Sequence, residues 1–328
     1  DRRKVELHIF YVGGVMDAET EWAKKQAAHF HHGLQNWRDW AYEIRNEQLD
    51  TLVYPEIGMD ATTLRLAALR LAPTQMVGWG HPITSGLPTM DAYISAKAFE
   101  PLGSDAHYSE KLISLKGIGA CYRPYKLKIP ACDFKEMGLH SDDVLIICAG
   151  MPMKYFPKYD PVFIEISKGC EQSKLIFFKK DGDPFFEKFE NRLRGAYRFE
   201  GLDFDNHVRF VPWLPRPEFF ALLQRADIYL DSIGFSGFNT AMQALECDLP
   251  IVAFEGDAMR GRFASGLLRT IGVQEWVTSN PAEFVEMVGR LAQDPASRQA
   301  YKRKIASHKS QLMNSASSVH ELCEIISQ

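Results

Sequence analysis

Short runs of apolar residues alternate along this chain with longer stretches in which apolar residues recur at helical spacing. A short apolar run is typical of a buried strand, and apolar residues three or four positions apart are typical of an amphipathic helix. Strands that alternate with helices predict an α/β protein with a mostly parallel sheet. The predicted strands are Val5–Val12, Thr51–Ile57, Thr74–Trp79, Tyr93–Ala96, Leu112–Leu115, Val144–Cys148, Lys174–Phe178, Val208–Val211, Ile228–Leu230 and Ile251–Phe254.

A segment with helical spacing, residues 17–48, follows the first strand and is predicted to form a long helix. It carries three histidines in the sequence HFHH. On a helix only His29 and His32 share a face, and the pattern supplies no third ligand beside them. The helical interpretation therefore favours no metal site in this segment.

The chain divides into two groups of strands at an irregular, proline-containing segment, residues 119–140. The length of 328 residues fits two domains of about 150 residues each. We therefore predict two doubly wound, Rossmann-like domains that face each other across a cleft, residues 1–125 and residues 126–328. A long polar helical tail is predicted to close the second domain.

Composition narrows the classes of function. The net charge of −4 gives no electrostatic case for binding nucleic acid. No apolar run approaches the ~20 residues that a membrane-spanning helix needs. The six cysteines are scattered without the spacing of a metal site or a disulfide framework, and a reducing cytoplasm is the expected compartment.

The sequence ADIYLDSIGFSGFNTAMQALECDLPIVAF, from residue 226, predicts a strand, a glycine-bearing loop, a helix and a second strand. The first turn of a helix presents unpaired N–H groups and a positive dipole end, which suits a phosphate. Gly237 lets the backbone approach a ligand closely, and Asn239 and Thr240 can touch it. The alternative interpretation is an ordinary loop in which Asn239 or Thr240 caps the helix.

Other predicted strands end in residues that suit the same ligand. Lys154 follows the strand that ends at Cys148, Arg216 follows the strand that ends at Val211, and the sequence EGDAMRGR follows Phe254. In doubly wound folds, ligands bind outside the carboxyl ends of the strands. A lysine, an arginine and helix N-termini at one edge predict a site for a nucleotide diphosphate.

Several stretches resemble the catalytic region of glycosyltransferase family 41, which holds the protein O-GlcNAc transferases and the bacterial adhesin N-glucosyltransferases. His81 in GHP, Lys154 in MPMK and the pair Asn239-Thr240 are more similar to the bacterial branch. The resembling stretches are LAPTQMVGWGHPITSG, MDAYISAKAFEP, HYSEKLISL, MPMKYFPKYDP, VRFVPWLPRPEFFALLQRADIYLDS and SGFNTAMQALECDLPIVAFEGDAMRGRFASGLLRTIG.

The resemblance implies a GT-B fold, a UDP-sugar donor, inversion at the anomeric carbon and no metal cofactor. Lys154 would bind the diphosphate and stabilise its charge during catalysis, and His81 would lie near the sugar or the acceptor. The remaining donor-binding residues implied are Arg216, Gly237, Phe238, Asn239, Thr240 and Gln243, where Gln243 replaces an acidic residue and Phe238 replaces a histidine of other members.

The resemblance also implies that this chain lacks the family's first strand and its acceptor-side loop, so that the N-terminal domain is incomplete. A second chain is then a candidate for the missing part. The expected partners are a UDP-sugar and an acceptor protein or peptide, with an adhesin as the candidate acceptor.

The leading hypothesis from the sequence is transfer of a hexose, with glucose favoured, from a UDP-sugar to Asn in Asn-x-Ser/Thr. The alternatives are O-GlcNAc transfer to Ser/Thr, a UDP-sugar 2-epimerase-like isomerase, and a non-catalytic module that binds nucleotide sugar. A D-x-D pattern at Asp203 and Asp205 is interpreted as structural, because two carboxylates alone make a poor cation site. No general base is identified.

Overall fold

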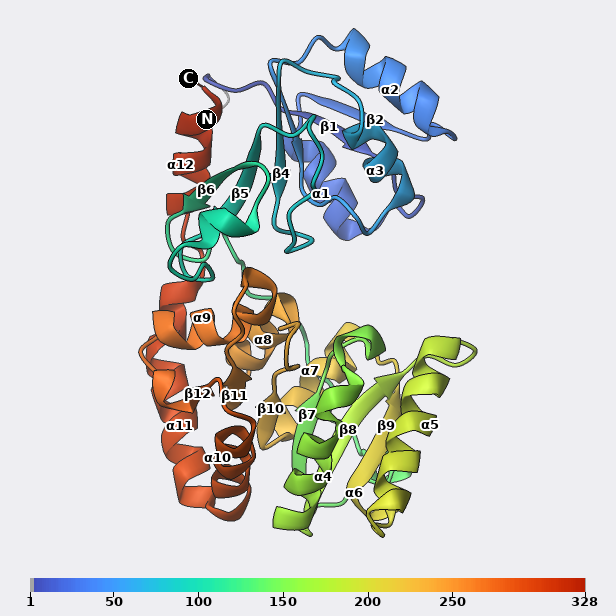
Figure 1. Cartoon of the computed structure of the whole chain (residues 1–328), viewed down its shortest axis with the longest axis vertical. Coiled ribbons are helices and arrows are strands. Elements are labelled where there is room, and N and C mark those ends of the chain that lie inside the picture. Colours follow the sequence, from blue (N-terminus) through green and yellow to red (C-terminus); the bar gives the residue numbers. More distant parts are fainter. Residues whose placement is uncertain (1–2, 328) are drawn as a thin grey trace. The chain divides into compact units, whose positions relative to one another are not determined.

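The computed structural model describes residues 3–327, which form two compact units (Figure 1). The first unit comprises the described parts of Asp1–Cys121 and Ala316–Gln328, and the second unit comprises Tyr122–Ser315. The chain thus passes from one unit to the other twice, near residues 121 and 316. The sequence pattern predicts a single passage, near residue 125.

The first unit contains a four-stranded parallel sheet and a separate two-stranded parallel ribbon. The strands of the sheet follow one another in chain order, and strand β5 at its interior is buried along its whole length. The strands are β1 (His8–Tyr11) and β2 (His29–His32) in the ribbon, and β3 (Thr51–Tyr54), β4 (Thr74–Gly78), β5 (Ala92–Ala96) and β6 (Lys111–Leu115) in the sheet. The helices are α1 (Ala18–Gln26), α2 (Trp37–Asn46), α3 (Ala61–Ala67) and α12 (Ser317–Ile326).

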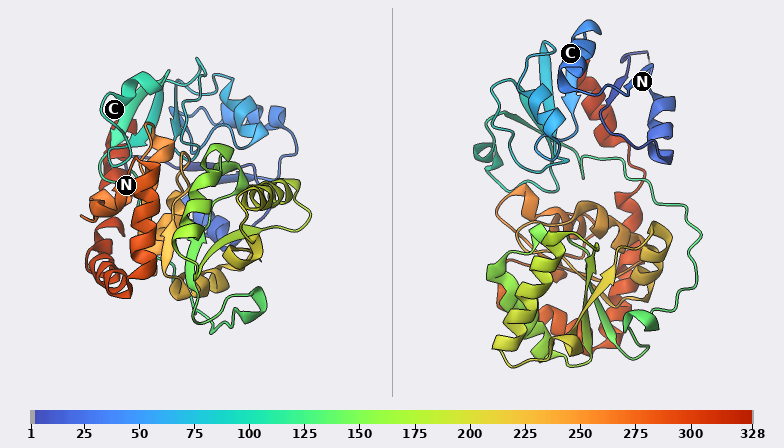
Figure 2. Two further views of the ribbon diagram at one scale, coloured as in Figure 1. Left: turned by 60° about the horizontal axis from the view of Figure 1, so that its bottom comes forward. Right: turned by 90° about the vertical axis from the view of Figure 1, so that its right-hand side faces the viewer.

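Helix α12 explains why the chain returns to the first unit. Its apolar residues pack against a cluster in the four-stranded sheet, and Figures 1 and 2 show it running beside β6. The residues in contact are Leu322, Ile325 and Ile326 of the helix and Met76, Ala92, Ile94 and Leu115 of the sheet. The prediction of a helical tail on the second domain did not place this helix on the first unit, because its apolar face is recognisable only with the sheet that it covers.

The prediction of one helix over residues 17–48 is wrong. The segment forms α1, β2 and α2, and the turn between β2 and α2 includes Gly33 with a positive φ of 88°. Two helix caps divide the segment, since Asp17 accepts from the backbone of α1 and Asn36 accepts from the backbone of α2. The HFHH sequence is therefore a strand, paired residue by residue with β1.

The second unit is built on a six-stranded sheet in the order β12-β11-β10-β7-β8-β9, with all its strands parallel. Its strands are β7 (Val144–Cys148), β8 (Ser173–Lys179), β9 (Val208–Pro212), β10 (Ile228–Leu230), β11 (Ile251–Phe254) and β12 (Val277–Thr278). Its helices are α4 (Asp160–Gly169), α5 (Pro184–Phe199), α6 (Phe204–His207), α7 (Arg216–Arg225), α8 (Phe238–Glu246), α9 (Phe263–Thr270), α10 (Pro281–Gln293) and α11 (Pro295–His308).

This sheet is doubly wound. The chain starts at the central strand β7, moves outward through β8 and β9, and then returns to the other side of β7 with β10. Helices α4 and α5 pack together on one face, while α7, α8 and α9 pack in succession on the other (Figure 1). Because both faces are covered, β7, β10 and β11 are buried at every position and carry mainly branched apolar residues.

The structure confirms the predicted α/β class with parallel sheets. In the described part of the chain, no helix combines the length and the apolar character that crossing a membrane requires.

Candidate active site

The direction of strand order reverses between β7 and β10, which are neighbours in the sheet. Such a switch point leaves a crevice at the carboxyl ends of the two strands, because the connections leave them toward opposite faces. Lys154 lies in a short 3₁₀ turn, Pro152–Lys154, after β7, and the GFSGFNT loop follows β10. The topology therefore brings together the lysine and the glycine-bearing loop that the sequence analysis singled out separately.

The half-buried Lys154 side chain contacts this loop directly. Among the described residues its ammonium donates a hydrogen bond only to the backbone carbonyl of Ser236, at a long 3.3 Å, and it lies 4.6 Å from the ring centre of Phe235. Burial lowers the pKa of Lys154, and the nearby Asp231 opposes this shift. An ammonium with a single long hydrogen bond is poorly compensated for its lost hydration, so an anionic ligand would improve its environment.

Asp231 is the buried acid of the site and directly follows β10. Its Oδ1 accepts a hydrogen bond of 3.2 Å from the backbone N–H of Gly237, while its Oδ2 has no hydrogen-bond partner among the described residues. Burial raises the pKa of Asp231 to about 6, against the hydrogen bonds from the Ser236 side chain and the Gly237 N–H and the charge of Lys154. The carboxyl group thus fixes the loop to the end of the strand at an electrostatic cost.

Helix α8 begins at Phe238, with Gly237 as its N-cap and no capping side chain. The interpretation of Asn239 or Thr240 as the N-cap is therefore wrong, because both lie inside the first turn. The exposed Asn239 side chain is available to a ligand, and the Thr240 hydroxyl hydrogen-bonds the hydroxyl of Tyr229 at 2.7 Å. A Cβ at position 237 would lie 2.5 Å from the Thr240 hydroxyl, so glycine is needed there for close packing.

The loop is held in place from the other side by the segment that follows β11. The Ser236 N–H donates to the carbonyl of Arg260 at 2.7 Å, and the Ser236 hydroxyl accepts from the N–H of Ala264 at 2.9 Å. Gly256 and Gly261 approach so closely that a Cβ on either would lie 3.1 Å from the other Cα. The EGDAMRGR sequence thus supports the loop, which is a role that the sequence analysis did not assign.

Arg216 and Gln243 lie on two different helices of the second unit. Arg216 begins α7 and covers the ring of Tyr125 at 4.4 Å, and the half-buried Gln243 lies in α8. The ring of Tyr122 contacts both Tyr125 and Phe238, which gives a row of aromatic side chains between the start of α7 and the start of α8. Glu246 secures this row by accepting from the Tyr122 hydroxyl and the Tyr125 N–H.

His81 belongs to the first unit, in the loop after β4. Its carbonyl accepts a 3.0 Å hydrogen bond from the hydroxyl of the buried Tyr93, and its half-buried ring lies 3.0 Å from where a Cβ on Gly58 would stand. The ring is therefore positioned by the backbone at the carboxyl end of the four-stranded sheet.

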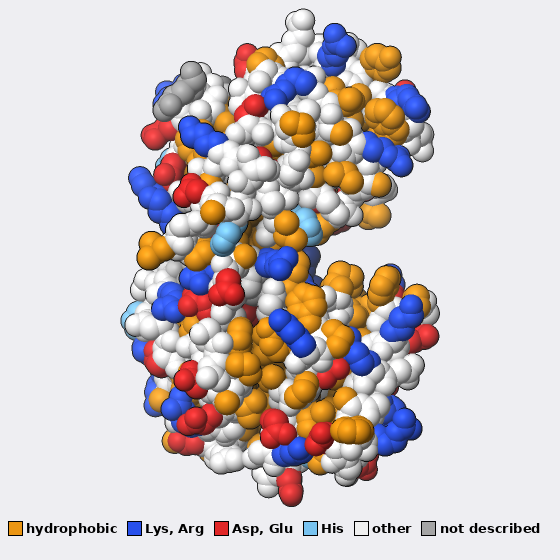
Figure 3. Space-filling view, in the orientation of Figure 1, with side chains coloured by type: hydrophobic (Ala, Val, Ile, Leu, Met, Phe, Trp, Pro, Cys, Tyr) orange, Lys and Arg blue, Asp and Glu red, His pale blue; other side chains and the backbone are white. Residues whose placement is uncertain are grey.

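The D-x-D pattern is occupied by structural contacts. Asp203 caps the short helix α6 by accepting from the N–H of Asp205, and Asp205 pairs with Arg194 at 2.9 Å. The surface charge of the second unit does not mark a ligand site, since acidic and basic side chains are interspersed on the face that Figure 3 shows. The electrostatics of the candidate site therefore depend on few groups, among them the buried Asp231 and the half-buried Lys154.

Comparisons with known proteins identify the fold and the family of this chain. A mutant of the O-GlcNAc transferase of Thermobaculum terrenum superposes with a TM-score of 0.85 at 22% sequence identity, covering 100% of this chain and 62% of that chain. This likeness confirms the predicted GT-B fold. A sequence profile described as Glycosyl transferase family 41 matches residues 138–322, more than half of the chain. The chain belongs to glycosyltransferase family 41.

Relatives from two branches of the family match. A tomato (Solanum lycopersicum) protein named as a probable UDP-N-acetylglucosamine–peptide N-acetylglucosaminyltransferase SPINDLY is 27% identical over 256 residues, which are 77% of this chain and 27% of that protein. The UDP-glucose:protein N-beta-glucosyltransferase of Actinobacillus pleuropneumoniae serotype 7 is 25% identical over 261 residues, 76% of this chain and 39% of that protein. The chain therefore spans well under half the length of these relatives. The prediction that it resembles the bacterial branch more closely stays a prediction.

Asp231 gives a prediction about stability. Its pKa is about 6 in the folded protein against an ordinary value of 3.8, so the folded state holds this proton more tightly than the unfolded state. Between about pH 4 and pH 6 the free energy of unfolding should therefore fall as pH rises, by about 3 kcal/mol from this group. Asp231→Asn keeps an oxygen for the Gly237 N–H and cannot ionise. Urea unfolding across this pH range should show a flatter pH dependence for the variant, and parallel curves for the two proteins would contradict the assignment.

Proposed function

We propose that this chain carries the donor site of an inverting protein glycosyltransferase, which moves a hexose from a UDP-sugar to a protein side chain. The observation that carries the proposal is the Lys154 ammonium, held against the Ser236–Gly237 loop at the switch point where α8 begins. Membership of family 41 supports the reaction class.

A diphosphate suits the contacts of Lys154 better than the loop carbonyl does. A phosphate oxygen would replace one long neutral contact by a charge-assisted hydrogen bond, which is roughly twice as strong. The start of α8 has no side-chain cap, so its N–H groups can turn to the same anion. Asp231 works against an anion, because a pKa of about 6 leaves its carboxyl mostly ionised at neutral pH. Lys154 and the N–H groups of α8 would have to outweigh that charge.

The same groups would act in the reaction. In an inverting displacement the acceptor atom attacks the anomeric carbon, the bond from that carbon to the diphosphate breaks, and its electron pair leaves with UDP. Negative charge therefore grows on the diphosphate in the transition state. Lys154 and the N–H groups of α8 would stabilise that charge as preorganised donors, and the proposal needs no metal ion for this purpose.

Glucose transfer to Asn in Asn-x-Ser/Thr is the favoured reaction. It is supported by the pair Asn239-Thr240 and by the similarity to the Actinobacillus protein, which is named for UDP-glucose and protein N-glucosylation. O-GlcNAc transfer is the second candidate, because the SPINDLY relatives are named as N-acetylglucosaminyltransferases. The acceptor is a protein or peptide, and a bacterial adhesin is the candidate.

Transfer can be tested with peptides that contain Asn-x-Ser/Thr, incubated with UDP-glucose or with UDP-GlcNAc and analysed by mass spectrometry. We expect one added hexose on Asn from UDP-glucose. Labelling of Ser or Thr alone, from UDP-GlcNAc alone, would contradict the favoured reaction while supporting the second candidate. Turnover of UDP-GlcNAc without an acceptor would instead favour an isomerase.

Lys154→Ala should weaken UDP binding ~10- to 150-fold, because a charge-assisted contact contributes about 1.5–3 kcal/mol. Sugar transfer should slow further, since the charge on the leaving diphosphate grows in the transition state. Thr240→Ala should weaken binding by less, because a neutral contact contributes about 0.5–1.5 kcal/mol. Isothermal titration with UDP gives the dissociation constants of the unmodified protein and of both variants, and a transfer assay gives the rates.

Lys158 is the matched control for Lys154. It is exposed, lies four residues later in the turn Pro157–Tyr159, and covers its neighbour Tyr159 at 4.7 Å from the ring centre. Lys158→Ala should leave UDP binding nearly unchanged. Loss of binding in Lys158→Ala, with normal binding in Lys154→Ala, would show that the donor site has been assigned to the wrong lysine.

His81 should act in transfer rather than in holding UDP. It lies in the first unit, whereas the proposed diphosphate contacts all lie in the second. His81→Ala should therefore lower the rate of sugar transfer and leave the dissociation constant for UDP nearly intact. If titration shows that UDP binding disappears together with activity, this division of roles is refuted.

A further inference from the structure

A cluster of histidine and glutamate side chains gathers in the first unit, where the β1–β2 ribbon meets the end of α2. Strand pairing sets His8 opposite His29, and the two-residue period of a strand puts His31 on the same face. The ring of His8 stacks on that of His29 with centres 4.5 Å apart, and it lies 6.1 Å from that of His31. The helical prediction placed His32 beside His29 and missed this arrangement.

Three side chains of the cluster converge in its interior. Glu47, at the C-terminal cap of α2, has one oxygen 3.1 Å from His8 Nδ1 and the other 3.8 Å from His31 Nε2. Ligand atoms placed 2.0–2.1 Å from a tetrahedral zinc ion stand about 3.3 Å apart, which lies between these two distances. All three side chains offer ligand atoms within 4.8 Å of one another.

Both ring nitrogens that face Glu47 are buried and lack a hydrogen-bond partner in the described part of the chain. The His8 side chain is only 10% exposed and that of His31 only 14% exposed. Buried polar atoms in folded proteins are otherwise nearly always hydrogen-bonded. Two such atoms directed at one carboxylate indicate a missing ligand that all three groups can share.

The other nitrogen of each ring is already hydrogen-bonded to a carboxylate. His8 Nε2 lies 3.0 Å from Glu6, and His31 Nδ1 lies 2.7 Å from Glu43. Because an ionised carboxylate only accepts, each of these nitrogens donates its N–H. A neutral ring then presents a lone pair on its opposite nitrogen, toward Glu47. Carboxylates that orient metal-bound histidines in this way are a regular part of zinc sites.

We propose that His8 Nδ1, His31 Nε2 and the Glu47 carboxylate bind a divalent first-row transition metal, with Zn²⁺ as the expected ion. Two imidazoles and one carboxylate are a donor set that zinc accepts with a fourth position left for water. Imidazole ligands also favour zinc over Mg²⁺ or Ca²⁺, which prefer oxygen. The ion would tie β1, β2 and the end of α2 together.

A cavity of about 570 Å³ in the first unit adjoins the cluster and supplies room for the fourth ligand. His8, Glu6 and Glu47 line it, together with Tyr54, whose buried hydroxyl has no hydrogen-bond partner among the described residues. Water bound to the metal at this side would have space and a polar neighbour.

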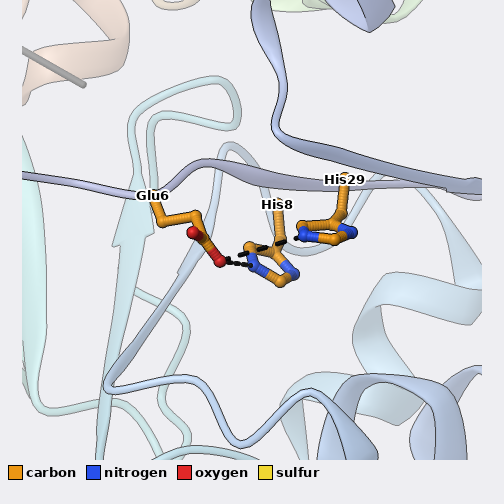
Figure 4. A group of neighbouring side chains, drawn as sticks. All are labelled: Glu6, His8 and His29. Atoms are coloured by element: carbon orange, nitrogen blue, oxygen red, sulfur yellow. Dashed lines mark hydrogen bonds and ion pairs between the residues drawn. The ribbon is translucent and has the colours of Figure 1, made fainter.

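Glu6, His8 and His29 form a second group on the outer side of the cluster, shown in Figure 4. It is the weaker candidate, because the His29 side chain is 56% exposed and lies 3.9 Å from Glu6, a carboxylate that His8 already uses. The inner group has two buried ligand atoms without partners, which the outer group lacks. The inner group is therefore the proposed site, with Glu6 and Glu43 as positioning residues.

Zinc binding by the chelator-treated protein tests the proposal, with isothermal titration for affinity and native mass spectrometry for stoichiometry. We expect one Zn²⁺ per chain and a thermal transition that rises with zinc concentration. Glu47→Gln and His31→Gln should each weaken binding by more than about 100-fold, and Glu6→Gln and Glu43→Gln by about 10- to 100-fold. Co²⁺ bound to the unmodified protein should show the visible bands of a low-symmetry, nitrogen-ligated site.

His32→Gln is the matched control, because His32 is exposed and lies on the opposite face of β2. It should bind zinc like the unmodified protein. The proposal is overturned if the unmodified protein binds no stoichiometric zinc, whatever the variants do. It is equally overturned if His29→Gln abolishes binding while Glu47→Gln and His31→Gln, shown by circular dichroism to be folded, bind normally.

Discussion

A buried carboxylate and a half-buried ammonium share the carboxyl edge of the second sheet, and the proposed donor site depends on this pair of charges. Asp231 fixes the Ser236–Gly237 loop to the end of β10, and the same loop provides the only hydrogen-bond acceptor that Lys154 has among the described residues. Each charge is poorly solvated, as the opposite pKa shifts of the two groups indicate. A site that lacks compensation for its cation is prepared for an anion, at some cost in stability when it is empty.

The elements that carry the proposed donor site could be predicted from the sequence because their signals are local. A strand, a glycine and a helix start follow one another within residues 228–246, and Lys154 follows the end of an earlier strand, β7. The adjacency of β7 and β10 is not local, so their joint crevice could only be expected from the fold class. The sequence shows Asp231 as a polar residue directly after a predicted strand. Its hydrogen bond to Gly237 could not be predicted, because it depends on how the loop folds back toward the strand.

The histidine-rich segment shows where local reasoning fails. Residues 17–48 have helical spacing of apolar residues, yet β2 forms in their midst because β1 offers it a partner. Strand pairing is set by contacts far apart in sequence and overrides a local helical preference. The change from a helical to a strand period replaces His32 by His31 beside His29, and with it the possible metal chemistry of the segment. The place of helix α12 on the first unit was not predicted for the same reason, since its partner strands lie some 200 residues earlier.

A structure of the protein with UDP bound tests the account of the donor site most directly. The account predicts diphosphate oxygens within about 3 Å of Lys154 Nζ and of backbone N–H groups in the first turn of α8, with the Lys154 contact to the Ser236 carbonyl replaced. A diphosphate bound away from the switch point, with Lys154 still donating to Ser236, would contradict it.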